Sequence, residues 1–198
     1  MKTLNGDRTL EWAWVLKKLP DKGKVLDVGC TNSLLPLTIM EMGHDVTGID
    51  IQEFGFTIDR IRFIKEDVVT RNFEDDKYDI IVNCSTVEHI GLRGRYGVEE
   101  ENLYGDIDAM RNLRHAMVMG GIMILTIPVG KDSIFMPLHR VYGPFRIGFL
   151  FHGYEIIEEE FWRKDDLDIW IPCDKKTALN EQPSKEYYAL GLFVLKGK

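Results

Sequence analysis

The 198-residue sequence contains only three cysteines, Cys30, Cys84 and Cys173, and no CxxC motif. An odd number of widely spaced cysteines argues against a disulfide framework and is typical of reduced thiols in the cytosol. The N-terminus is polar and soon acidic, so it lacks the apolar stretch of a signal peptide. We therefore expect a cytoplasmic protein.

Long hydrophobic runs and an excess of basic residues are also missing. No apolar run approaches the roughly 20 residues that span a bilayer, so no transmembrane segment is expected. The chain has 25 Lys and Arg against 32 Asp and Glu, a formal net charge of −7. General nucleic-acid binding relies on basic side chains to neutralise phosphates and is not expected, although an RNA substrate stays open.

The sequence does contain a regular alternation of strands and helices, and 44% of its residues are hydrophobic, as in ordinary globular proteins. The expected strands are residues 24–28, 45–49, 62–65, 78–83 and 122–127. The expected helices are residues 8–19, 34–42 and 106–119, the last ended by Gly120 and Gly121, with a poor helix at 52–60. Residues 154–160, 166–171 and 187–195 have β-like patterns.

This alternation predicts an α/β fold with a doubly wound, mostly parallel sheet of about seven strands. Helices would cover both faces, and the terminal strands would form an antiparallel edge. We expect a single domain over residues 1–198. It would comprise an N-terminal helix at 1–23, a cofactor-binding core at 24–128, and an acceptor lid with the terminal strands at 129–198.

The first strand runs into a turn that starts at Gly29, and an acid, Asp50, ends the next strand. Together they are typical of a nucleoside site at the open end of a parallel sheet. A dinucleotide fingerprint needs two further glycines, but Thr31 and Leu34 stand there. Asp27 would repel a pyrophosphate, whereas it suits a cationic cofactor without phosphate. S-adenosylmethionine has these properties, and a nicotinamide dinucleotide is a lower alternative.

Four segments in order resemble class I S-adenosylmethionine-dependent methyltransferases. Residues 25–30 are similar to the first motif of that family, 48–50 to the second, 65–68 to the third, and 78–85 to the fourth strand. The resemblance covers residues 24 to about 128. It departs from the family in the turn, where Asn32 and Ser33 stand in place of small residues or glycine.

The resemblance implies that the Asp50 carboxylate binds the ribose hydroxyls and that Asp67 or a neighbouring amide meets the adenine. Asp50 as a helix cap, Asp67 as a solvated loop acid and Cys30 as a small turn residue are the alternatives. The cofactor-binding residues expected in this way are Asp27, Gly29, Cys30, Asn32, Ser33, Asp50, Ile51, Asp67, Val68, Cys84 and Ser85.

Glu88 and His89 follow the fourth strand and are the first candidates for catalysis. A hydroxyl acceptor needs a general base, which His89 could provide while Glu88 orients it or holds the cofactor. The pair could instead cap a helix and pack. Adjacent residues point to different sides and no third ligand is near, so no metal site is expected.

The acceptor would lie near a glycine-rich loop and a lid at residues 131–152. Arg93 and Arg95 could clamp a carboxylate or phosphate, or could be solvated arginines paired with acids at 99–101. The aromatic run at 145–151 could instead be a membrane-surface or partner patch, or ordinary core. The remaining candidates are His139 and Tyr142 for catalysis, and Tyr96 and Arg140 for substrate binding.

The sequence predicts methyl transfer from S-adenosylmethionine to an oxygen or nitrogen of a small-molecule or glycan-type acceptor. Residues 83–97 also resemble methyltransferase-like proteins of unassigned function linked to surface-polysaccharide synthesis. A non-catalytic cofactor-binding or scaffold protein is the alternative from another class, and a NAD-dependent oxidoreductase ranks lower. Either a monomer or a homodimer is compatible with the sequence.

Overall fold

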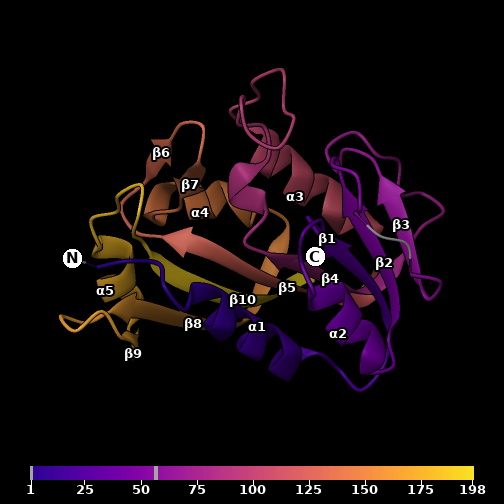
Figure 1. Cartoon of the computed structure of the whole chain (residues 1–198), viewed down its shortest axis with the longest axis horizontal. Helices are drawn as coiled ribbons and strands as arrows, with labels where there is room; N and C mark the ends of the chain where they lie inside the picture. Colours follow the sequence, from indigo (N-terminus) through magenta and orange to yellow (C-terminus); the bar gives the residue numbers. More distant parts are fainter. Residues whose placement is uncertain (1, 56–57) are drawn as a thin grey trace.

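A computed structural model describes residues 2–55 and 58–198 (Figure 1). Its centre is an eight-stranded sheet in the order β3-β2-β1-β4-β5-β10-β8-β9. The strands are β1 (Lys24–Val28), β2 (Asp45–Asp50), β3 (Ile61–Lys65), β4 (Tyr78–Cys84), β5 (Met117–Val129), β8 (Tyr154–Lys164), β9 (Trp170–Cys173) and β10 (Ala189–Gly197). Strands β1 to β5 are parallel, whereas β10, β8 and β9 each run antiparallel to their neighbours. The predicted α/β class and its mostly parallel sheet are confirmed.

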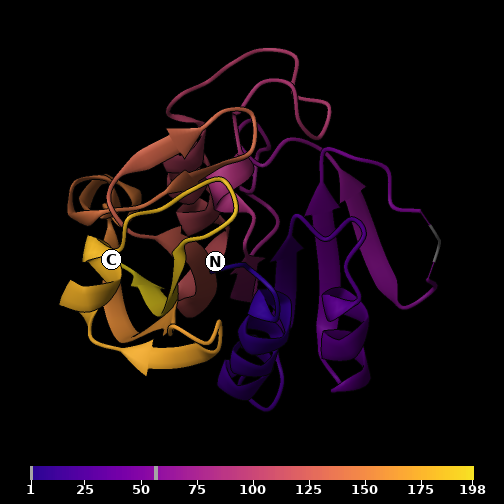
Figure 2. The ribbon, with the colours of Figure 1, turned by 60° about the vertical axis from the view of Figure 1, so that its left-hand side comes forward.

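Two hydrophobic clusters cover the two faces of this sheet because successive strand residues point to opposite sides. In β1, Val25 packs in one cluster and Leu26 in the other. Helices α1 (Asp7–Lys18) and α2 (Leu35–Glu41) cover the Val25 face, and Figures 1 and 2 show them together on one side. Helices α3 (Gly105–Ala116), α4 (Pro144–Leu150) and α5 (Lys175–Asn180) cover the Leu26 face.

The carboxyl ends of β1 to β4 meet at one edge of the sheet, since these strands are parallel. The short 3₁₀ helix η1 (Val87–His89) follows β4 at this edge. The loop between η1 and α3 and the hairpin β6 (Ser133–Phe135)–β7 (His139–Val141) lie above the sheet in Figures 1 and 2. Residues far apart in sequence therefore converge here.

The helix expected at 106–119 ends at Ala116, so this boundary was wrong. Met117 pairs with Tyr78 and starts β5, and Gly120 and Gly121 lie inside that strand instead of ending the helix. The register between β4 and β5 shifts after Tyr78, and Gly120 has φ +86°, which a β-bulge tolerates best with glycine. Apolar spacing alone could not separate the helix from a strand that follows it without a loop.

Several short elements lay outside the sequence prediction. The segment 131–152 folds into the β6–β7 hairpin and α4. Asp174 caps the N-terminus of α5, and its carboxylate accepts the Thr177 N–H at 2.9 Å. No helix forms in residues 52–55 and 58–60, while residues 56–57 of the predicted poor helix lie outside the described residues. No helix in the described part of the chain is long and apolar enough to cross a membrane.

Candidate functional site

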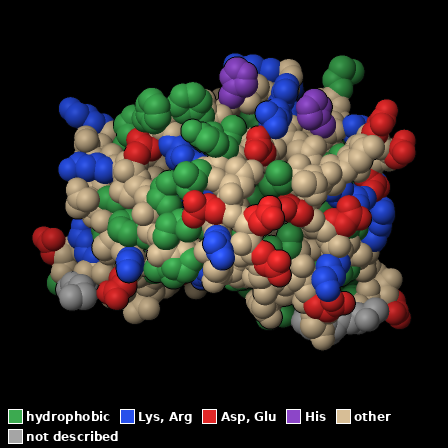
Figure 3. All heavy atoms as spheres, turned by 90° about the horizontal axis from the view of Figure 1, so that it is seen from above, with side chains coloured by type: hydrophobic (Ala, Val, Ile, Leu, Met, Phe, Trp, Pro, Cys, Tyr) green, Lys and Arg blue, Asp and Glu red, His purple; other side chains and the backbone are tan. Residues whose placement is uncertain are grey.

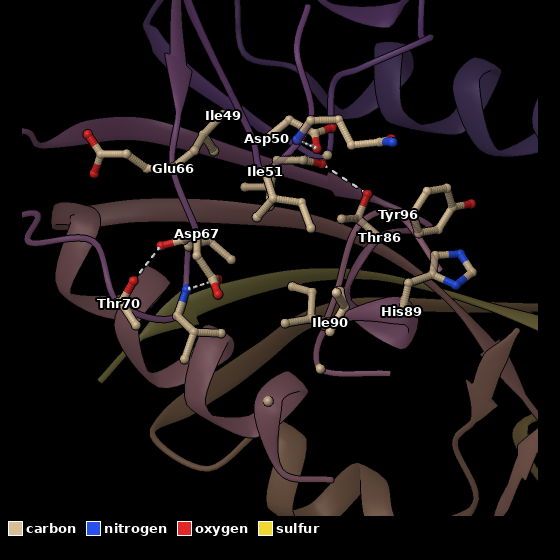
Figure 4. Close-up of a pocket in the computed structure, with 18 of the residues that line it drawn as sticks. Ile49, Asp50, Ile51, Glu66, Asp67, Thr70, Thr86, His89, Ile90 and Tyr96 are labelled. Carbon is tan, nitrogen blue, oxygen red and sulfur yellow. Dashed lines mark hydrogen bonds between the residues drawn. The ribbon is translucent and has the colours of Figure 1, made fainter. Parts of the chain in front are cut away.

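A cavity of about 340 Å³ opens at the carboxyl ends of β1 to β4, the edge where α/β sheets bind ligands (Figure 4). Its lining comes from five segments: Val28, Gly29 and Thr31; Ile49 to Gln52; Glu66 to Thr70; Ser85, Thr86 and His89 to Gly91; and Tyr96, Val98, Glu100, Asn102 and Gly105. Seen from above, acidic side chains gather toward the middle of this face of the molecule (Figure 3).

Gly29 allows β1 and β4 to approach closely at the floor of this cavity. Its φ is +74°, and its N–H donates to the Ile49 carbonyl at 2.9 Å. A Cβ at position 29 would lie 2.3 Å from Cγ2 and Oγ1 of Thr86, whose hydroxyl donates to the Val28 carbonyl at 3.0 Å. The turn therefore needs glycine both for its backbone conformation and for space.

We expect Gly29→Ala to lower the free energy of unfolding by about 2–4 kcal/mol, because left-handed strain and overpacking add. Gly43→Ala is the matched control, since Gly43 has φ +96° but nothing within 4 Å of an added Cβ. It should lose only about 1 kcal/mol from backbone strain. Denaturant unfolding of both variants checks this, and equal losses would show that contact with Thr86 contributes nothing.

Asp50 lies at the end of β2 with its carboxylate oriented by two backbone amides. Oδ2 accepts the Thr31 N–H and Oδ1 accepts the Gln52 N–H, each at 2.9 Å. A carboxylate oxygen accepts more than one hydrogen bond, so both oxygens can still accept from a ligand hydroxyl. Figure 4 shows Asp50 beside Ile51 in the cavity wall.

Asp67 and Val68 line the cavity beyond the end of β3. The Asp67 carboxylate accepts the Val69 N–H at 2.8 Å, and its carbonyl accepts the Thr70 N–H at 3.1 Å. Asp67 thus stabilises a local turn, as a loop acid would, and it also lines the cavity. Neighbouring Glu66 is a cavity acid that the sequence analysis did not name.

Asp27 lies next to the cavity at the end of β1, almost completely buried. Its Oδ2 has no hydrogen-bond partner among the described residues. Burial, together with the charge of Asp50, raises the pKa of Asp27 to about 8. A cation bound nearby would favour the ionised form and relieve this cost.

The other turn residues expected to bind a cofactor do not line the cavity. Cys30 is buried with its sulfur against Gly48, and Ser33 Oγ accepts the Leu35 N–H at 3.1 Å. Asn32 takes φ +61°, the conformation that asparagine tolerates better than most residues. Cys84 is buried, and its sulfur lies 3.6 Å from Thr126 Oγ1. Ser85, the next residue, does line the cavity.

In η1, Glu88 is buried and His89 is partly buried, and His89 lies in the cavity wall beside Tyr96 (Figure 4). His89 Nδ1 donates to the Leu138 carbonyl at 2.6 Å, and Nε2 lies 3.6 Å from Glu88 Oε1. Burial lowers the pKa of His89 to about 3 and raises the pKa of Glu88 to about 8. A proton at neutral pH therefore resides on Glu88, while His89 is neutral.

The arginines expected to clamp an acidic acceptor do not line the cavity. Arg95 donates to the Leu138 carbonyl at 3.0 Å, and its guanidinium lies 4.5 Å from the centre of the Tyr96 ring. Arg93 does not line the cavity, whereas Tyr96 does. No described partner among the acids at 99–101 is found for either arginine, so the alternative pairing is also absent from the described residues.

Arg140, Tyr142 and His139 do not line this cavity, and their expected roles stay predictions. Arg140 and Tyr142 are completely buried, and the Tyr142 hydroxyl donates to Asp106 at 3.0 Å. His139 is buried against Tyr188, with ring centres 5.0 Å apart. Their side chains hold the upper loops together and do not reach the cavity in this structure.

The aromatic run at 145–151 divides between core and surface. Ile147, Leu150 and Phe151 are buried against the sheet, as the ordinary-core alternative expects. Phe145 and Phe149 are exposed on α4 and make an edge-to-face contact, with ring centres 5.1 Å apart. The run is therefore one amphipathic helix and not a continuous patch.

Glu11 is a buried acid beside the cavity that the sequence analysis missed. It accepts from the hydroxyls of Ser85 and Thr126, the latter at 2.7 Å, and Arg8 lies 3.6 Å away. Burial raises the pKa of Glu11. The signal was present in the sequence, because Glu11 falls three residues before Trp14 on the apolar side of the first helix.

The sequence analysis expected no metal site. Within residues 2–55 and 58–198, no group of three or more His, Cys, Asp and Glu side chains could hold a metal ion.

Comparison with known proteins finds a matching family model and relatives named as methyltransferases. The family model described as "Caenorhabditis protein of unknown function, DUF268" matches residues 38–192. "Putative methyltransferase YqeM" of Bacillus subtilis (strain 168) is 29% identical over 83 residues, which are 37% of this chain and 34% of that protein. The ubiquinone biosynthesis O-methyltransferase of Bordetella avium is 30% identical over 93 residues, 41% of this chain and 38% of that protein. The match thus spans little more than a third of these relatives.

Solved structures share the fold at low sequence identity. The N-methyltransferase NodS of Bradyrhizobium japonicum WM9 superposes with a TM-score of 0.66 at 12% identity, covering 98% of this chain and 97% of NodS. A 1,6-didemethyltoxoflavin-N1-methyltransferase of Burkholderia thailandensis, solved with S-adenosylhomocysteine, has a TM-score of 0.63 at 13% identity and covers 96% of this chain and 77% of that one. The resemblance to S-adenosylmethionine-dependent methyltransferases is confirmed.

Proposed function

Because the chain belongs to the DUF268 family, whose description gives no activity, we propose its function from the site: transfer of a methyl group from S-adenosylmethionine to an oxygen or nitrogen of a small-molecule or glycan-type acceptor. One observation carries this proposal. The cavity opens at the carboxyl ends of β1 and β2, with an oriented Asp50 at its rim and the bare backbone of Gly29 at its floor. The likeness to proteins named as methyltransferases supports it.

The residues around the cavity fit this cofactor. Asp27 has an unpartnered, buried carboxylate oxygen, which a cationic group nearby would stabilise in its ionised form. Asp50 can accept from two hydroxyls of a ribose, and Asp67 or its neighbouring amides can meet a base. When bound, S-adenosylmethionine supplies a methyl group already activated by its sulfonium. The protein then has mainly to bind and orient the acceptor, which can provide roughly 7–11 kcal/mol.

His89 is the candidate for taking the proton that an acceptor releases. It lines the cavity, and its Nε2 lone pair can accept a proton because Nδ1 donates to the Leu138 carbonyl. Glu88 lies 3.6 Å from Nε2 and already carries its own proton at neutral pH, so it is a neutral neighbour of His89 and not the proton acceptor. The link to polysaccharide synthesis stays a prediction.

The nicotinamide alternative is disfavoured by the same residues. Asp50, Glu66, Asp67 and Glu100 line the cavity, and no Lys or Arg does among the described residues. A pyrophosphate placed there would meet carboxylates without a compensating base.

Calorimetric titration with S-adenosylmethionine and S-adenosylhomocysteine tests the proposal directly. We expect the wild type to bind both, and Asp50→Ala to weaken binding about tenfold to a hundredfold, because charge-assisted hydrogen bonds to the ribose are lost. Asp45→Ala, which removes an exposed acid at the opposite end of β2, is the matched control and should bind as the wild type does.

No binding of either compound by the folded wild type would sink the proposal. Binding without methyl transfer across a panel of alcohols and amines would favour the non-catalytic alternative instead.

A further inference from the structure

One cavity acid has no task in the function proposed above. Asp50, Glu66 and Asp67 come from the ends of β2 and β3, where the cofactor would lie. Glu100 comes from the loop between η1 and α3, and its carboxylate forms no hydrogen bond or ion pair with the described residues. This loop supplies Tyr96, Val98 and Asn102 to the same wall.

The loop that carries Glu100 is held in place by its own backbone. The Asn102 N–H donates to the Gly91 carbonyl at 2.9 Å, and the Gly94 N–H donates to the Val98 carbonyl at 3.0 Å. Buried Arg140 donates to the Asn102 carbonyl at 3.2 Å. Glu100 is therefore presented to the cavity by an anchored segment.

The hydroxyl of Ser85 offers only lone pairs to the cavity. The Ser85 N–H donates to Thr126 Oγ1 at 3.0 Å, and the Thr126 hydroxyl in turn donates to Glu11. Ser85 Oγ donates its own hydrogen to the same Glu11 carboxylate. Ser85 is more than nine-tenths buried and lines the cavity, so a ligand can reach this oxygen only as a donor.

Several N–H groups of the polar side chains near this wall are used within the protein. The only N–H of neutral His89 is used on the Leu138 carbonyl. The Asn102 amide is used within its own loop, donating to Asp108 at 3.3 Å and accepting from the Tyr104 N–H at 3.0 Å. Arg95 is turned to Leu138 and the Tyr96 ring. An acceptor carboxylate or phosphate would find no Lys or Arg among the described lining residues and would face the carboxylates of Asp50, Glu66, Asp67 and Glu100.

An ammonium group has the opposite chemistry, with three donors and a positive charge. We propose that the methyl acceptor is an amine that enters this cavity as an ammonium, is recognised by the Glu100 carboxylate and Ser85 Oγ, and loses one proton to His89 Nε2, so that the lone pair of its nitrogen can attack the methyl group while the sulfonium leaves as a neutral thioether. This inference rests on the proposed methyl transfer and selects nitrogen from the two acceptor atoms named above. It replaces the carboxylate or phosphate clamp that Arg93 and Arg95 suggested in the sequence.

Two matched sets of probes test the proposal at neutral pH: benzylamine, benzyl alcohol and benzoate, and butylamine, butanol and butyrate. Binding is measured by ligand-observed NMR, with and without S-adenosylhomocysteine. We expect each amine to bind about tenfold more tightly than its alcohol, and the carboxylates not to bind. Glu100→Gln should weaken amine binding about threefold to tenfold, because one partly solvated charge is removed.

Glu101→Gln is the matched control, since it makes the same charge change on the same loop at a residue outside the cavity lining. It should leave amine binding unchanged, and both variants should keep the wild-type affinity for S-adenosylhomocysteine. No preference for amines, or equal effects of the two variants, overturns the inference. A cofactor titration that fails while amines still bind contradicts the proposed methyl transfer and not the amine site.

Discussion

Arg140→Met is expected to lower the free energy of unfolding by about 3–5 kcal/mol, because it removes a buried charge and leaves its partners unpaired. The Arg140 side chain is completely buried, and its Nε lies 3.7 Å from Asp106 Oδ1. Its guanidinium also donates to four backbone carbonyls, those of Glu88, Ile90, Asn102 and Leu103, at 2.7–3.3 Å. Methionine fills similar space without any donor.

Urea unfolding followed by tryptophan fluorescence measures this loss. Arg111→Met is the control, since Arg111 is largely exposed and pairs only with Asp108 on its own helix. It should change stability by less than about 0.5 kcal/mol. Arg140→Lys keeps the charge near Asp106 but loses the several N–H donors of the guanidinium. Its loss of unfolding free energy should lie between those of Arg140→Met and Arg111→Met. A loss below about 1 kcal/mol for Arg140→Met would show that water satisfies these carbonyls.

The same residue shows why the acceptor side of the site could not be predicted from sequence. Arg140 stands in a stretch rich in aromatic and basic residues, which resembles the wall of a binding pocket. Whether its guanidinium faces a ligand or the backbone of the loop at 90–104 depends on how the β6–β7 hairpin packs against that loop, and this packing joins residues 37 to 52 positions apart in sequence. The same holds for Tyr142, since its hydroxyl is used on Asp106 of α3.

The cofactor side was more predictable because it depends on local sequence. Neighbouring residues of a strand point to opposite faces of the sheet, and both members of the pairs Val25–Leu26 and Ile80–Ile81 are apolar. Such strands must be covered on both faces. Once these strands are parallel, the residues that follow them must meet at one edge, so Gly29, Asp50 and Asp67 line one cavity. The sequence could not predict which individual turn residues, such as Ser33, face the cavity. The backbone dihedral angles within the turn decide this, and the sequence does not specify them.

Glu88→Gln is expected to stabilise the protein at about pH 8 and to change little at about pH 5. Glu88 is completely buried, and neither carboxylate oxygen has a hydrogen-bond partner among the described residues. Burial raises its pKa from 4.5 to about 8. The folded protein keeps this proton up to about pH 8, whereas the unfolded chain releases it above pH 4.5. The contribution of protonated Glu88 to the free energy of unfolding is therefore fully present below pH 4.5 and is lost as the pH rises toward 8.

Glutamine is a neutral group of the same shape and does not titrate, so the two proteins should diverge with pH. Between about pH 5 and pH 8 the unfolding free energy of the wild type should fall by about 3 kcal/mol more than that of Glu88→Gln. Denaturant unfolding at several pH values measures the difference, and Glu101→Gln, an exposed site, should follow the wild type. Parallel curves for wild type and Glu88→Gln would mean that Glu88 is ionised in the folded protein. A buried negative charge would then stand behind His89, and His89 would be the group that holds a proton at neutral pH.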